Sequence, residues 1–110
     1  MTSEGARALA ARRCQPGAAR LPAAQLQAHI EALPGWTPTG SAIAKIFRFP
    51  GYPQTIAFVN AVAAIAQREN HHPELSVHYD HCIVTWSTHS AGGVTMNDLI
   101  CAAQVDELRP

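Results

Sequence analysis

Residues 53–70 read PQTIAFVNAVAAIAQREN and contain no glycine and no proline after Pro53. Apolar side chains recur in this stretch at intervals of three and four residues. They are Ile56, Val59, Ala63 and Ala66, with Phe58, Val62 and Ile65 widening the same face. Such a period is typical of an amphipathic helix that lays one face on a hydrophobic core. We therefore predict a long helix here, and the rest of the fold is arranged around it.

A hairpin is predicted on each side of this helix. The segment His71-His72-Pro73 follows the helix, which cannot continue through the proline because its ring blocks the helical backbone. Residues 75–87 then form two β-prone segments around Asp80-His81. Before the helix, residues 36–49 are similarly β-prone and contain a turn at Thr39-Gly40-Ser41. Each pair of segments predicts two antiparallel strands.

Shorter helices are predicted at both ends of the domain. Leu26, Ile30 and Leu33 follow Pro22 at helical spacing, and Pro34-Gly35 ends the run. Near the C-terminus, Thr95-Met96-Asn97-Asp98 has the pattern of a capping box before a helix over 99–108. The order is then helix, two strands, helix, two strands, helix. We predict an α+β fold, a four-stranded antiparallel sheet with three helices packed on one face.

The first twenty residues have a different composition. They are rich in alanine, carry four arginines against Glu4 alone, and contain Pro16-Gly17 without a sustained apolar face. This composition predicts a flexible N-terminal tail over residues 1–20, followed by a single domain over residues 21–110. An organelle transit peptide is the functional alternative, because such leaders are also rich in arginine and poor in acidic residues.

The overall composition excludes several classes of function. Lys plus Arg total 8 and Asp plus Glu total 8, so no net charge draws the protein to nucleic acid. No apolar run approaches the length of a membrane span, and we expect a cytoplasmic protein. The three cysteines lack a C-x-x-C pair, which favours a reducing compartment. Cys82 and Cys101 are predicted to be core residues, and Cys14 to be exposed.

Histidine is the anomaly of the composition. Five of the six histidines fall between His71 and His89, while the sixth, His29, is predicted to be solvated. His71 and His72 stand at the end of the long helix, and His89 stands at the end of the second strand of the following hairpin. Because a hairpin returns the chain to near its start, these three imidazoles are predicted to converge at one edge of the sheet. His78 and His81 are interpreted as surface residues of the hairpin.

Converging imidazoles suit two kinds of chemistry. Imidazole titrates near neutral pH, so one ring can donate a proton while another accepts one, as the loss of water requires. Three neutral imidazoles with an open position also describe catalytic zinc, although adjacent histidines generally point apart and no H-E-x-x-H motif is present. Asp98 caps a helix and could also orient a histidine. Trp36 and Trp86 are predicted to pack in the core, yet a flat heteroaromatic substrate would need such a ring nearby.

The residues from about Leu33 to Leu108 resemble the pterin-4a-carbinolamine dehydratase family, whose animal members also serve as dimerisation cofactors for a homeodomain transcription factor. The most specific motif is the pair His71-His72 before Pro73-Glu74, with Ser87-Thr88-His89 at this distance. The other matching residues are Gly35-Trp36, Phe47, Phe49, Phe58, Val62, Tyr79, Ala91-Gly92 and Asp98.

This resemblance implies the same sheet and helices, assembled into homodimers or homotetramers. It also implies a reaction, the dehydration of 4a-hydroxytetrahydropterin to quinonoid dihydropterin without a metal or redox cofactor. The substrate is the carbinolamine that an aromatic amino acid hydroxylase leaves behind, so the resemblance implies a role in pterin recycling. A non-catalytic protein-interaction module and a metal-dependent hydrolase are the alternatives to this reaction.

The resemblance also implies roles for individual residues. His71 and His89 would form the proton-transfer pair, and His72 would bind and polarise the pterin. The remaining matching positions would line the substrate pocket or support it. Pro73, Thr88, Ser90 and Ala91 would line the pocket with the three histidines, while Asp98 and Trp36 would be supporting residues. Two positions depart from the common pattern, since Gln67 replaces an acidic residue and Leu75 replaces an aromatic one.

Overall fold

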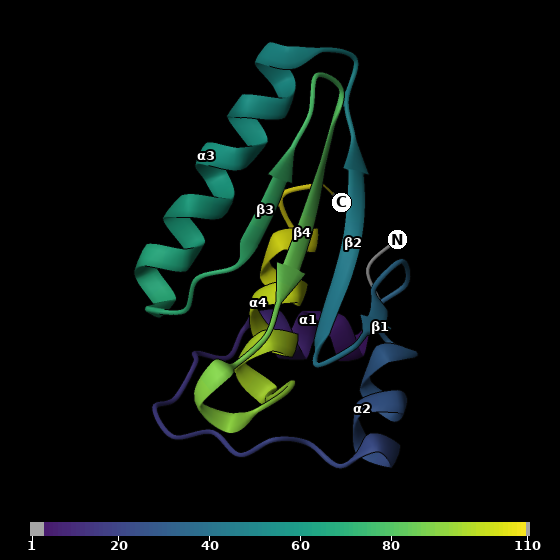
Figure 1. Cartoon of the computed structure of the whole chain (residues 1–110), viewed down its shortest axis with the longest axis vertical. Helices are drawn as coiled ribbons and strands as arrows, with labels where there is room; N and C mark the ends of the chain where they lie inside the picture. The colour runs from purple at the N-terminus through teal and green to yellow at the C-terminus, as the bar shows by residue number, and fades with distance from the viewer. Residues whose placement is uncertain (1–3, 110) are drawn as a thin grey trace.

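The computed structural model describes residues 4–109, which form one antiparallel sheet and its covering helices (Figure 1). The strands lie in the order β1-β2-β4-β3. They are β1 (Thr37–Thr39), β2 (Ala42–Arg48), β3 (Glu74–Val77) and β4 (His81–Trp86). The helices are α1 (Glu4–Ala10), α2 (Ala23–Ile30), α3 (Tyr52–Glu69) and α4 (Met96–Asp106), with a 3₁₀ turn, η1, at His89–Ala91. The predicted α+β class and both hairpins are confirmed, but this part of the chain has four α-helices rather than three.

One face of the sheet carries the core. On β4, the alternate residues Cys82, Val84 and Trp86 are buried, as the two-residue period of a strand requires. Phe47 of the neighbouring strand β2 lies on the same face and packs against Phe58 of α3, with ring centroids 4.7 Å apart. None of the helices over residues 4–109 is both long enough and apolar enough to cross a bilayer.

Helix α3 confirms the predicted long helix, although its core face is rotated. The buried residues are Thr55, Phe58, Val62, Ile65, Ala66 and Glu69, whereas Ala63 is exposed. Alanine occurs on every side of this helix. The apolar pattern alone therefore could not tell which side of the helix forms the centre of the buried face. Thr55 is tolerated in the core because its hydroxyl donates to the carbonyl oxygens of Gly51 and Tyr79.

The C-terminal end of α3 and the N-terminal end of α4 are each fixed by a local capping structure. Asn70 ends α3 in the left-handed conformation, with φ at 52°, and so redirects the chain into His71 and Pro73. The predicted capping box of α4 is present, because the Thr95 hydroxyl accepts from the Asn97 N–H and the Asp98 carboxylate accepts from the Thr95 N–H.

The N-terminal region differs from its prediction as a flexible tail. Residues 1–3 lie outside the described residues, but residues 4–20 are packed on the domain. Ala6 and Leu9 of α1 are buried against α4, which is itself buried from Asn97 to Val105 because it lies between the sheet and α1. Of the residues of α1, only Ala6 and Leu9 are buried. Because so few buried residues are needed, the sequence of α1 does not show the long apolar face by which a packed helix is usually recognised.

Beyond α1, the chain is held by hydrogen bonds to two buried side chains. Glu69, whose side chain is 1% exposed, accepts from the Cys14 N–H at 2.9 Å and forms an ion pair with Arg13 at 2.8 Å. Asn97 accepts from the Gln15 N–H at 2.9 Å and donates to the Gln15 carbonyl at 2.8 Å. Cys14 is therefore half-buried rather than exposed as predicted.

These contacts change the titration of Glu69. Burial by itself would raise the pKa, but hydrogen bonds from the Cys14 N–H, the Gln104 amide and the Arg13 guanidinium, together with the charge of Arg13, lower it from 4.5 to about 2. A carboxylate with a depressed pKa in the folded state stabilises the fold above its unfolded pKa. That contribution is lost as the pH falls from about 4.5 towards 2.

We expect Glu69→Gln to lower the free energy of unfolding at neutral pH by on the order of 3 kcal/mol, the equivalent of the pKa shift. The difference from the parent should shrink as the pH falls through this window, because the parent carboxylate becomes protonated. Urea unfolding of both proteins across the window measures this difference. Glu74→Gln, at an exposed position, is the matched control. A difference for Glu69→Gln that is absent at neutral pH, or that persists at pH 2, would contradict the prediction.

Candidate active site

His71 and Asp98 form the centre of the candidate site. The Nε2 atom of His71 lies 2.6 Å from Oδ1 of Asp98, which is fully buried at the start of α4. The other carboxylate oxygen accepts from the Thr88 hydroxyl at 2.8 Å and from the Thr95 N–H at 2.9 Å. Because a carboxylate only accepts hydrogen bonds, the neutral His71 ring carries its proton on Nε2. Its Nδ1 atom is then the nitrogen that can accept a proton from a bound molecule.

The His71 ring is held from a second direction by Trp86. The two rings stack with centroids 5.4 Å apart and planes 15° apart. The His71 side chain is only 14% exposed, so stacking and the bond to Asp98 leave it little freedom to rotate. These two contacts give a fixed imidazole with one edge open to solvent.

A tight loop joins the end of β4 to the start of α4 and fixes the other side of the site. Thr88 pairs with Gly93 in an isolated bridge, and the Thr88 and Thr95 hydroxyls lie 3.0 Å apart. Between Thr88 and Gly93, the turn η1 is capped by Gly92, whose φ of 73° is a conformation that favours glycine. This loop carries His89 and Ser90 and sets Thr88 against Asp98.

A cavity of about 330 Å³ opens beside His71. Its walls come from three parts of the chain. The lining residues are Glu69, Asn70 and His71 at the end of α3, Thr88, Ser90 and Asn97 near the start of α4, and Cys14 to Ala18. A larger hollow of about 590 Å³ lies next to α2, but among residues 4–109 Arg20 is the one charged residue that lines it. The smaller cavity is the one that combines an imidazole with hydroxyl and amide groups.

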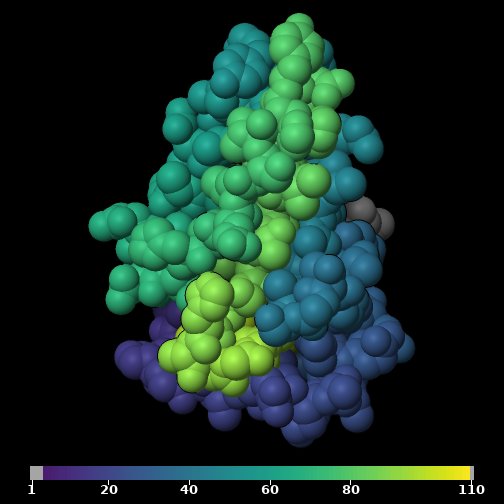
Figure 2. Space-filling view, viewed as in Figure 1, coloured from purple at the N-terminus to yellow at the C-terminus, as the bar shows by residue number. Residues whose placement is uncertain are grey.

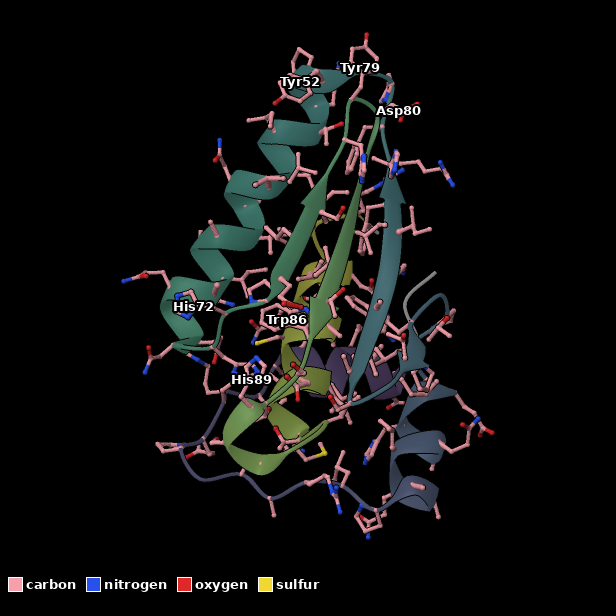
Figure 3. All side chains as sticks on the ribbon, in the orientation of Figure 1. Tyr52, His72, Tyr79, Asp80, Trp86 and His89 are labelled. Atoms are coloured by element: carbon pink, nitrogen blue, oxygen red, sulfur yellow. The ribbon has the colours of Figure 1, made fainter. Side chains whose placement is uncertain are left out.

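The cavity contains some of the predicted pocket residues and not others. His71, Thr88 and Ser90 line it, whereas His72, Pro73, His89 and Ala91 do not. His72 and His89 are exposed, and Figure 3 shows both in the same part of the molecule as Trp86. No hydrogen bond joins the three imidazoles to one another within the part of the chain that the structure describes.

Comparison with known proteins identifies the family. The model of the family described as pterin 4 alpha carbinolamine dehydratase matches residues 19–108. The chain belongs to this family. The resemblance seen in the sequence is thereby confirmed. The prediction that the protein is a dehydratase, a kind of hydro-lyase, is confirmed as well.

Individual relatives agree with this family. A protein of Chromobacterium violaceum with the provisional name pterin-4-alpha-carbinolamine dehydratase is 51% identical over 79 residues, which cover 72% of this chain and 73% of its own. A protein of Stenotrophomonas maltophilia with the same provisional name is 47% identical over 105 residues, 91% of this chain and 90% of its own. The crystal structure of a transcriptional coactivator/pterin dehydratase from Brucella melitensis matches with a TM-score of 0.80 at 30% identity. That match covers 83% of this chain and 99% of the Brucella chain.

The tryptophan that stacks on His71 is Trp86, whereas Trp36 lies elsewhere in the fold. Trp36 was predicted as a supporting residue, but its indole N–H donates to Asp106 at 3.0 Å and its ring packs edge-on against Phe47. Asp106 ends α4 whereas Asp98 lies in its first turn, so roughly 12 Å of helix separates them. Trp36 therefore supports the core at the far end of α4. Trp86 is fully buried on the core face of β4, as predicted, and its ring also stacks on His71.

His78 and His81, predicted to be surface residues of the hairpin, lie away from His71. Their rings stack with centroids 4.2 Å apart near the tip of the β3–β4 hairpin. Tyr79 and Asp80, which lie between them in the chain, are at the top of the molecule in Figure 3, far from His89. The hydrogen bond from His81 lowers the pKa of the exposed Asp80. Over residues 4–109, no three His, Cys, Asp or Glu side chains are grouped so that they could hold a metal ion.

Proposed function

We propose that this dehydratase removes water from 4a-hydroxytetrahydropterin by histidine acid–base catalysis and gives quinonoid dihydropterin. The observation that carries the proposal is His71 itself, an imidazole fixed by a buried carboxylate and a stacked indole on the wall of a cavity. A fixed base whose proton-accepting nitrogen is already selected suits a reaction in which a proton must be taken from one defined atom.

The reaction needs two proton transfers on neighbouring atoms. The bond between C4a and its hydroxyl oxygen breaks, and the hydroxyl leaves as water once it has gained a proton. The adjacent ring nitrogen N5 loses its proton, and the electron pair of its N–H bond forms the C4a–N5 double bond. Nothing is oxidised or reduced, so a proton acceptor and a proton donor are sufficient.

The proposed division of roles follows from these requirements. His71, with Nδ1 free, takes the proton from N5, while the exposed His89 donates a proton to the departing hydroxyl. His72 binds and polarises the pterin at the end of α3. Thr88 and Ser90 line the cavity with His71, and Pro73 and Ala91, next to the histidines in the chain, complete the pocket. Asp98 is a positioning residue, because it acts through His71.

We expect the purified protein to accelerate carbinolamine dehydration above its uncatalysed rate, and the acceleration to be unchanged by a metal chelator. Stopped-flow ultraviolet absorbance measures both rates directly, with the uncatalysed reaction as the baseline. His78→Ala, which removes an imidazole at the opposite end of the molecule, should keep the parent rate. No acceleration would contradict the proposal, and an acceleration that the chelator abolishes would favour a metal-dependent enzyme instead.

The proposal extends to the setting of the reaction. The substrate is the pterin that an aromatic amino acid hydroxylase has used, so the enzyme acts in pterin recycling in the cytoplasm as a homodimer or homotetramer. The Brucella relative is described as both a coactivator and a dehydratase. Assembly with a partner protein that survives loss of the histidines, in a protein without dehydratase activity, would favour the interaction-module alternative.

A further inference from the structure

We infer that residues 14–18, the N-terminal wall, form part of the pterin pocket and that Gln15 contacts the bound pterin and sets its affinity. This inference rests on the proposed function, since it names a further residue of the same site. All five residues of the N-terminal wall, from Cys14 to Ala18, line the cavity that His71, Thr88 and Ser90 also line. A molecule that occupies this cavity beside His71 therefore lies against the wall.

The N-terminal wall lies just before the residues that the family model matches. The family model begins at residue 19, one residue after Ala18. The Brucella structure is matched over 99% of its length by 83% of this chain, so this chain is the longer of the two. Figure 1 shows the segment between α1 and α2 passing below η1, and Figure 2 shows it against the neighbouring loop at the base of the molecule. Residues outside the range of the family model thus line the cavity of this chain.

The position of the N-terminal wall is set by the neighbours of the His71–Asp98 pair. Glu69 lies two residues before His71 and accepts from the Cys14 N–H. Asn97 directly precedes Asp98 and binds both the N–H and the carbonyl of Gln15. The same two helix ends therefore hold the imidazole and the wall, which fixes the distance between them.

The thiol of Cys14 adds a further attachment to α4. Its Sγ atom lies 3.5 Å from Sγ of the buried Cys101 and 3.6 Å from the Asn97 carbonyl. Main-chain and side-chain contacts thus fasten residues 14 and 15 along α4. A wall that is held at consecutive residues can present a side chain to a ligand at low cost in conformational entropy.

Gln15 has the right chemistry to recognise a pterin. Its main chain is fully engaged by Asn97, but its exposed side-chain amide has no hydrogen-bond partner among residues 4–109. A carboxamide presents an acceptor oxygen beside a donor nitrogen. The pyrimidine ring of a pterin presents the complementary pair, the N3–H donor beside the C4 carbonyl. Two hydrogen bonds can therefore form between them.

The test is Gln15→Ala, which removes the amide and leaves the main-chain bonds to Asn97 in place. We expect KM for the carbinolamine to rise about tenfold, the value of one or two net hydrogen bonds, with kcat within about twofold of the parent. Leu9→Ala is the structural control, because it loosens α1 on α4 without touching the cavity. It should lower the melting temperature and leave KM unchanged. An unchanged KM in Gln15→Ala, or an equal change in Leu9→Ala, would overturn the inference.

A binding measurement separates this inference from the proposed function. Stable 7,8-dihydropterin is titrated into the parent and into Gln15→Ala, with the tryptophan fluorescence of the protein as the signal. If the parent binds it but does not dehydrate the carbinolamine, the proposed function fails. An approximately tenfold weaker Kd in Gln15→Ala would still support the inference that Gln15 contacts the pterin. Equal Kd values for the two proteins, or no binding by the parent, would overturn this inference whatever the activity.

Discussion

His71→Ala is expected to lower kcat for carbinolamine dehydration by about a hundredfold or more, as the loss of a general base does. His71 is the imidazole of the site with the fewest degrees of freedom, because it is bound to Asp98 and stacked on Trp86. Its replacement removes the proton acceptor and leaves a space that water can enter. A water molecule there is a weaker base and is not fixed against N5, so the remaining residues cannot restore the rate.

The measurement is single-turnover stopped-flow absorbance, with circular dichroism and thermal unfolding of the same samples. Because Asp98 would lose a hydrogen bond, His71→Ala is also expected to be about 1–3 kcal/mol less stable, so rates are compared well below its melting temperature. His71→Gln is the second variant, since its amide can restore a donor to Asp98 without supplying a base. A folded His71→Ala or His71→Gln with kcat within threefold of the parent would exclude His71 as the base.

Elements whose ends are marked in the sequence could be predicted. Pro34-Gly35, Pro50-Gly51 and Pro73 separate the helices from the hairpins, and each boundary lies within a few residues of its prediction. The capping box at Thr95 was equally visible, because its chemistry is confined to four consecutive residues. Local patterns of this kind depend on neighbours in the chain, which a sequence displays directly.

Contacts between distant residues could not be predicted in this way. Cys14 meets Glu69 across 55 positions and Gln15 meets Asn97 across 82, and no periodicity links such pairs. The N-terminal region therefore read as a tail, because its arginines and small residues gave no sign of the buried carboxylate that receives them. Which of the two tryptophans contacts His71 could not be predicted for the same reason, since only the packing of β4 against His71 distinguishes the two rings.

The candidate site lies between these two cases. The pair His71-His72 and the more distant His89 could be singled out because a hairpin returns the chain towards its start. The sequence could not say which imidazole is fixed. That property depends on Asp98, 27 residues from His71, and on a fully buried carboxylate that also accepts from the Thr88 hydroxyl. A residue predicted chiefly as a helix cap is thus also the residue that orients His71.

Asp98→Asn is expected to lower kcat by about ten- to a hundredfold and stability by about 2–3 kcal/mol. The buried carboxylate accepts three hydrogen bonds, from the Nε2–H of His71, the Thr88 hydroxyl and the Thr95 N–H. An asparagine offers one acceptor oxygen and an NH₂ group that must donate. The oxygen and the NH₂ group lie on opposite sides of the asparagine amide. Whichever way the amide is turned, its NH₂ group therefore faces a donor, either His71 or the Thr95 N–H.

If the amide NH₂ faces His71, it donates to Nε2 and forces the proton of the neutral ring onto Nδ1. The imidazole then has no free nitrogen for the substrate, so kcat falls while KM stays within a few fold. If the NH₂ faces Thr95 instead, two donors oppose each other and the cap of α4 is lost. The variant is therefore expected to lose activity, stability or a share of both, depending on how its two orientations are populated.

Asp106→Asn is the matched control, because it makes the same substitution at the other end of α4. Asp106 accepts from Trp36 and pairs with Lys45, so its replacement should lower stability while kcat stays within twofold of the parent. Rates, KM and urea unfolding are measured for both variants at a temperature where each is folded. An equal loss of kcat in the two variants would mean that Asp98 acts through stability alone. A parent-like kcat together with a parent-like stability in Asp98→Asn would show that the carboxylate neither sets the proton position of His71 nor caps α4.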